Sequence, residues 1–95
     1  MTFYHGTSTT LQVGATLLPA IETGNLREFW RKTNQDWVFA TTSLKSALYF
    51  ANKACSVYGG DPVVYEVQPI GLYKRTIGVE YIMRKAKILR EVVIA

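Results

Sequence analysis

The chain has 95 residues, of which 48% are hydrophobic, 13% aromatic and 19% charged. This length allows one domain with one core, and so apolar a composition excludes an intrinsically disordered chain. The apolar runs are too short for a membrane-spanning helix, and the N-terminus lacks the basic and apolar regions of a signal peptide. One cysteine, Cys55, and one histidine exclude an internal disulfide and a zinc site. We therefore expect a soluble, monomeric protein of the reducing cytoplasm, with no metal.

The formal net charge of +4 has two interpretations. It attracts a polyanion such as a dinucleotide or nucleic acid, or it reflects an ordinary basic surface. For so modest an excess we favour the ordinary surface. The positive residues nevertheless gather in the last quarter of the chain, at Lys74, Arg75, Arg84, Lys85, Lys87 and Arg90.

The first third of the chain predicts short elements. Residues 2–5 are aromatic and predict a strand that ends at Gly6, and the polar residues 7–10 predict a loop. Apolar and polar residues alternate weakly over residues 11–18. Residues 25–32 predict a short helix capped by Asn25.

The clearest helix signal follows a strand predicted at residues 36–41. Thr42 and Ser43 are good helix N-caps, and Gly59-Gly60 is a typical helix end. Between them the apolar residues recur at the spacing of one buried helix face, namely Leu44, Ala47, Leu48, Ala51, Ala54 and Cys55.

Further strands are predicted after this helix. Residues 63–67 form a strand that we expect Pro69 to stop, and residues 79–84 and 87–94 form two more. A loop between Gly71 and Gly78 is expected to carry Lys74 and Arg75. The fold class is therefore α+β, with five or six strands, one main helix and one short helix. Because strands and helices do not alternate, a doubly wound parallel sheet is not expected.

The sequence lacks the common catalytic motifs: no Gly-x-Ser-x-Gly elbow, no Gly-x-Gly-x-x-Gly and no phosphate loop is present. What remains is binding chemistry built on one imidazole, aromatic rings and one carboxylate. His5 followed by Gly6 leaves backbone that a flat ligand can approach, although a structural histidine is the alternative. Glu80 lies among apolar neighbours in a predicted strand, so its carboxylate faces solvent or a functional cleft.

At these residues the sequence resembles the ADP-ribosyltransferase superfamily. Residues 4–8, followed by Leu11, Gly14, Leu17 and Pro19, are similar to the opening of rifamycin ADP-ribosyltransferases and of poly-ADP-ribose polymerases. Residues 37–51 resemble the family's strand and its Ser-Ala-x-Tyr helix. Residues 79–82 resemble the segment with the catalytic glutamate. The resemblance implies a single small domain over residues 1–95, with two packed antiparallel or mixed sheets.

The resemblance also implies roles around NAD, which is the substrate of this superfamily. His5 would contact the adenosine ribose and act with Glu80, the catalytic acid beside the nicotinamide ribose. Gly6 would hold the nicotinamide carboxamide, and Phe39, where the family usually has Tyr, would stack on the nicotinamide. Tyr49 would face the other side of this ring or pack in the core. The remaining NAD contacts would come from Thr7 and Thr41.

Two departures from the family bear on the acceptor. Residues 72–75 are basic where rifamycin-modifying members are acidic, and Gly78 stands where arginine-specific members have Glu. We therefore expect a protein acceptor rather than a small molecule or a nucleic acid.

The sequence thus predicts an NAD-dependent mono-ADP-ribosyltransferase, of a size typical of a phage or bacterial effector. The alternatives are an NAD glycohydrolase, a catalytically inactive NAD-binding or nucleotide-binding module of the same fold, and a basic nucleic-acid binder.

Overall fold

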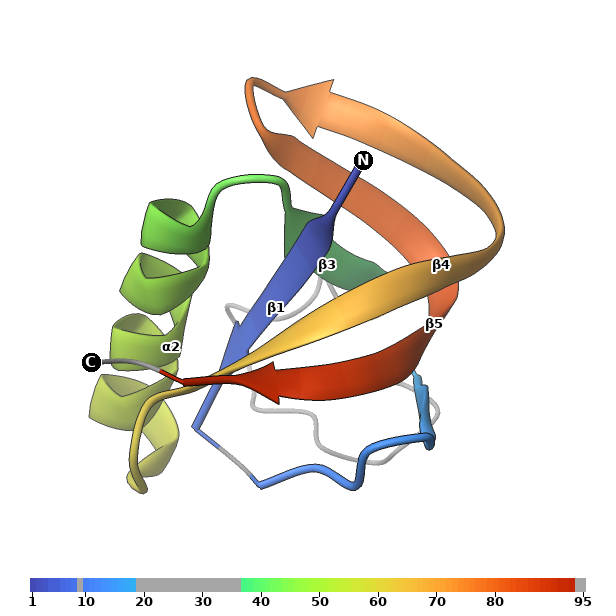
Figure 1. Cartoon of the computed structure of the whole chain (residues 1–95). Helices are drawn as coiled ribbons and strands as arrows, with labels where there is room; N and C mark the ends of the chain where they lie inside the picture. The colour runs from blue at the N-terminus through green and yellow to red at the C-terminus, as the bar shows by residue number, and fades with distance from the viewer. Residues whose placement is uncertain (9, 19–36, 94–95) are drawn as a thin grey trace.

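The computed structural model describes residues 1–8, 10–18 and 37–93 (Figure 1). The short helix expected at residues 25–32 lies outside them. The described elements are, in chain order, β1 (Phe3–Thr7), β2 (Thr16–Leu17), β3 (Val38–Thr41), α2 (Leu44–Tyr58), β4 (Val63–Ile77) and β5 (Glu80–Val92). The main helix has the predicted bounds, and the fold is α+β.

The strands form one antiparallel sheet in the order β2-β5-β3-β1-β4, and β4 also pairs with β5. These pairings join β1, β3, β5 and β4 into a closed ring of strands. The N-terminal strand β1 lies inside the sheet, between β3 and β4 (Figure 1). All described pairings are antiparallel, in agreement with the expectation against a parallel sheet. The arrangement as two packed sheets stays a prediction.

We predicted that Pro69 stops the strand that begins at residue 63. This is wrong, because β4 continues to Ile77. The pairing of β1 with β4 ends at Phe3↔Val67, so β4 has one paired neighbour, β5, at Pro69. A proline, which has no N–H to donate, is tolerated in such an edge strand. The loop expected to carry Lys74 and Arg75 is therefore part of β4, after an irregularity in the pairing between Ile70 and Tyr73.

The two strands predicted at residues 79–84 and 87–94 are one strand, β5. Arg84 and Lys85 do not interrupt it, because both side chains are exposed while the backbone remains paired with β4 through Lys85↔Ile70 and Ala86↔Pro69. β4 and β5 thus form one long, bent hairpin (Figure 1).

The core lies on both sides of the sheet. Inside the strand ring, buried side chains of β1, β3, β4 and β5 pack together, among them Phe3, Tyr65, Met83 and Ile88, and partly buried residues such as Leu17 of β2 pack against them. The hydroxyl of Tyr65 is satisfied there, since it accepts from the backbone N–H of Leu11 at 2.7 Å. A second cluster, outside the ring, holds α2 against the sheet and consists of Ala47, Ala51 and Val64, with Tyr4 and Val92 at its edge.

Helix α2 begins and ends where the sequence indicates. The Ser43 side chain accepts from the Ser46 N–H at 3.2 Å, and the Gly59 N–H donates to the Cys55 carbonyl at 2.8 Å. Gly6 lets the helix approach β1 closely, because a Cβ there would overlap the Ala47 carbonyl oxygen. Among the described residues, no helix combines the length and apolarity needed to cross a membrane.

Candidate active site

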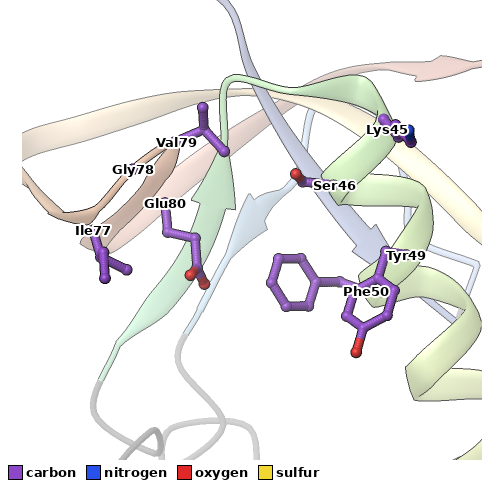
Figure 2. A pocket seen from close by; sticks show the side chains of 8 residues that line it. All are labelled: Lys45, Ser46, Tyr49, Phe50, Ile77, Gly78, Val79 and Glu80. Carbon is purple, nitrogen blue, oxygen red and sulfur yellow. The ribbon is translucent and has the colours of Figure 1, made fainter.

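An open pocket of about 520 Å³ lies between the start of α2 and the turn that joins β4 to β5. Its walls are two short segments that are about 30 residues apart in the chain. The Glu80 carboxylate points into the space toward the aromatic rings on α2 (Figure 2). The lining residues are Lys45, Ser46, Tyr49, Phe50, Ile77, Gly78, Val79 and Glu80.

Glu80 is held by backbone pairing on both sides. It pairs with Thr41 of β3 and with Ile77 of β4, across a two-residue turn of Gly78 and Val79. Gly78 has a φ of 57°, whereas Val79 has a negative φ, which is the pattern of a type II′ hairpin turn. Since such a turn requires glycine at its first position, Gly78 fixes where Glu80 enters the strand.

The start of α2 is tied to the same turn. The Thr42 N–H donates to the Val79 carbonyl at 3.1 Å, and the Ser43 N–H donates to the Thr41 hydroxyl at 3.1 Å. The Ser46 N–H in turn donates to the Ser43 hydroxyl. This chain of bonds fixes both pocket walls relative to each other.

Two aromatic rings form the α2 wall of the pocket. Tyr49 and Phe50 meet edge to face, with ring centroids 5.6 Å apart and an interplanar angle of 69°. Tyr49 is 62% exposed, so it is not the core residue that was one of its two predicted roles. Phe39, the predicted stacking residue, is not in the pocket lining.

His5 lies where β1 and β3 separate. The pairing between these strands consists of Tyr4↔Thr41, and beyond it the His5 Nδ1 lies 2.8 Å from the Phe39 carbonyl oxygen. A carbonyl only accepts, so Nδ1 carries the proton and Nε2 is left as an acceptor when the ring is neutral. Burial lowers the pKa of His5 below 6.5, although the bond to Phe39 opposes this shift. The ring is therefore neutral near pH 7, with Nε2 able to accept from a hydroxyl.

The strand register relates His5 to Glu80. Tyr4, Thr41 and Glu80 form a row across β1, β3 and β5. With strands about 4.8 Å apart, the Cα of Glu80 lies roughly 10 Å from that of Tyr4. His5 is the next residue, but side chains alternate along a strand, so its imidazole leaves β1 on the other side from Tyr4. In the structure, His5 therefore bonds to the Phe39 backbone, whereas Glu80 lines the pocket with Tyr49.

Three further residues were predicted to contact NAD: Gly6, Thr7 and Thr41. Gly6 is two residues from Tyr4, so its N–H and C=O point toward β3, like those of Tyr4, past the last paired residue. Thr7 ends β1 opposite Val63. Thr41 is 1% exposed, and its hydroxyl accepts a hydrogen bond from the Ser43 N–H at the start of α2.

Sequence reasoning did not assign Ile77, Gly78 and Val79 of the turn to the site. It also missed three lining residues on α2: Lys45, Ser46 and Phe50. The available signal was helical spacing. Residues 45, 46, 49 and 50 share the helix face beside the buried Ala47 and Ala51, and they lie one turn apart. Within the described ranges, no three His, Cys, Asp or Glu side chains gather as metal ligands would.

Comparison with known families identifies the family of the chain. A family model described as rifampin ADP-ribosyl transferase matches residues 3–81, a span that includes β1, β3, α2 and Glu80. The chain therefore belongs to the ADP-ribosyltransferase superfamily. Within this superfamily, the chain belongs to the rifampin ADP-ribosyl transferase family. A search of curated proteins found no match.

Proposed function

We propose that the chain cleaves NAD at the nicotinamide–ribose bond and transfers ADP-ribose to an acceptor. The observation that carries this proposal is the Glu80 carboxylate, which points into an open pocket with aromatic rings opposite it (Figure 2). Membership of the family supports the reaction class. The pocket is of the size that small-molecule and cofactor sites have.

Glu80 suits the chemistry of this cleavage. As the bond from ribose C1 to the nicotinamide nitrogen breaks, nicotinamide leaves with the electron pair and the ribose becomes oxocarbenium-like. A fixed carboxylate stabilises this developing positive charge more than the ground state, which accelerates the step. The acceptor then forms a bond to C1 and loses its proton. We propose that Glu80 also orients the acceptor.

We propose the remaining roles from the positions of the side chains. Tyr49 is exposed on the pocket wall, and we propose that it stacks on the nicotinamide cation, an interaction of roughly 0.5–2 kcal/mol. We propose His5 Nε2 as an acceptor for a hydroxyl of the adenosine ribose, and the Gly6 backbone as the partner of the carboxamide. Phe39 supports this arrangement through its carbonyl, which orients His5.

Nicotinamide release from NAD tests the reaction and the role of Glu80. We expect Glu80→Gln to lower turnover about a hundred- to thousand-fold while the protein remains folded, because it removes the charge and keeps the shape. Glu91→Gln, on an exposed part of the same strand, is the matched control and should behave like wild type. If Glu80→Gln released nicotinamide at the wild-type rate, Glu80 would be ruled out as the catalytic residue.

Experiments with and without an acceptor distinguish the remaining candidate functions. Release of nicotinamide without any acceptor would identify an NAD glycohydrolase, and NAD binding without release would identify an inactive binding module. Rifampin, which the family description names, is the second candidate acceptor. We favour a protein acceptor because the pocket wall continues into the basic residues Lys74 and Arg75. Mass spectrometry after incubation with NAD and either rifampin or a cell extract distinguishes the two.

A further inference from the structure

The second half of β4 is an exposed sheet edge. We define the β4 edge as residues 72–77. Residues 73–75 and 77 pair with β5 on one side. β1 does not pair with them, since its pairing ends at Val67, and it contacts them where the Phe3 and Tyr73 rings meet. Leu72 is 92% exposed and Ile77 71% exposed, so the edge is uncovered. In an edge strand, alternate backbone N–H and C=O groups point to the open side, where another strand can pair with them.

The β4 edge also carries uncompensated positive charge. Lys74 and Arg75 are exposed, and neither makes an ion pair with any residue that the structure describes. The sequence from Gln68 to Val79 contains no acidic residue. An extended ligand along this edge would therefore meet cations and aliphatic side chains together. The aromatic residue of the edge, Tyr73, already packs its ring against Phe3 and Tyr81.

The β4 edge lies within reach of the proposed catalytic acid. Ile77 pairs with Glu80 and lines the same pocket, and Lys74 pairs with Ile82, two residues further along β5. A strand added beside β4 would run about 10 Å from β5, which is two strand spacings. Side chains extending from both backbones can span this gap.

We propose that the β4 edge binds an extended acidic segment of the protein acceptor by strand addition and so presents one of its side chains to Glu80. As a statement about the acceptor, this rests on the proposed transferase function. Backbone groups and aliphatic side chains suit a polypeptide, whereas a nucleic acid would use the cations and aromatic stacking. Lysines on an edge also serve to prevent strand pairing, which is the interpretation that the test must exclude.

Peptide binding to the intact protein, measured without NAD, tests the proposal. The probe is a fluorescein-labelled eight-residue peptide of alternating Val and Glu, followed by anisotropy. We expect Lys74→Gln/Arg75→Gln to weaken binding at least about fivefold, since two cation contacts are lost. The matched control Lys85→Gln/Lys87→Gln removes the same charge from β5 and should change the affinity less than about twofold.

A second peptide separates strand addition from simple charge attraction. N-methylation at alternate residues keeps the charge but removes the backbone donors, so this peptide should lose binding. Equal binding of the methylated peptide, tighter binding of an oligothymidylate, equal effects of the two double variants, or no binding of the Val-Glu peptide would each overturn the proposal. Peptide binding is measured without NAD, so a failure of NAD turnover counts against the proposed function and not against this surface.

Discussion

At His5, one hydrogen bond determines which ring nitrogen is available. The Phe39 carbonyl accepts a hydrogen bond from Nδ1–H, so Nε2 of the neutral ring is left to accept a hydrogen bond from a donor. Burial favours the neutral ring, whereas the bond to Phe39 favours the charged one. A charged imidazole at this half-buried position would lose hydration that the Phe39 carbonyl replaces only in part.

The lowered pKa of His5 predicts a pH dependence of stability. As the pH falls through about 6.5, the unfolded chain takes up a proton on His5 and the folded chain does not. The contribution of His5 to stability is therefore complete above pH 6.5 and is lost as the pH falls toward the folded pKa, by up to about 1.4 kcal/mol per pH unit. Urea unfolding between pH 7.5 and 5.5 measures it. His5→Gln should show a flatter profile, and identical slopes would contradict the prediction.

The two aromatic candidates for nicotinamide stacking are separable by substitution. We expect Tyr49→Ala to weaken NAD binding about three- to thirtyfold, because the exposed ring on the pocket wall is lost. Tyr49→Phe, which keeps the ring, should bind like wild type. Phe39→Ala should weaken binding less than Tyr49→Ala. Calorimetric titration in the Glu80→Gln background measures these affinities without turnover. If Phe39→Ala weakened binding more than Tyr49→Ala, the stacking residue would be Phe39.

The sequence predicted the site in part. Glu80 and Tyr49 were identified and do line one pocket. Ser46 and Phe50 were missed because their importance comes from the angle at which α2 meets the β4–β5 turn. That angle depends on bonds between segments distant in the chain, such as Thr42 to Val79, which leave no local pattern.

Among the elements, the contact between β1 and α2 is the tightest that a single residue controls. A Cβ at Gly6 would overlap the Ala47 carbonyl and lie 2.8 Å from the Ala51 nitrogen, both of which are backbone atoms that cannot rotate away. We expect Gly6→Ala to destabilise the fold by about 1–3 kcal/mol, as overpacking does. Asn52→Ala, on the exposed side of α2, is the control and should change stability by less than about 0.5 kcal/mol. Urea unfolding compares them, and equal stabilities would show that α2 can move away.

Helix α2 and the long hairpin differ in how well local sequence predicts them. The caps Ser43 and Gly59 and the apolar spacing between them all lie within α2, so its bounds could be predicted. The length of β4 could not, because Pro69 ends a strand only where its missing N–H is needed. Its tolerance depends on β1, some 60 residues earlier, whose pairing with β4 extends no further than Phe3↔Val67. The continuity of β5 through Arg84 likewise depends on its pairing with β4.

For the whole molecule, ligand binding and stability are coupled. The pocket joins the start of α2 to the β4–β5 turn, so a ligand held there binds the folded chain and not the unfolded one. At a hundredfold excess over its Kd, NAD should add about 2.7 kcal/mol, which raises the Tm of a chain of this size by roughly 10–20 °C. Differential scanning fluorimetry of Glu80→Gln measures this without turnover. An unchanged Tm would show that the pocket does not hold NAD.

The position of β1 inside the sheet has a consequence for biosynthesis. β1 is synthesised before its partners β3 and β4, and the strand ring closes only when β5 has been made. Until then, the aromatic residues of β1 have no completed sheet in which to be buried. Such distant pairings slow folding, because a large chain entropy is lost before the contacts form. Nascent chains arrested before residue 80 should therefore remain open to proteolysis, and protection should arise in one late step.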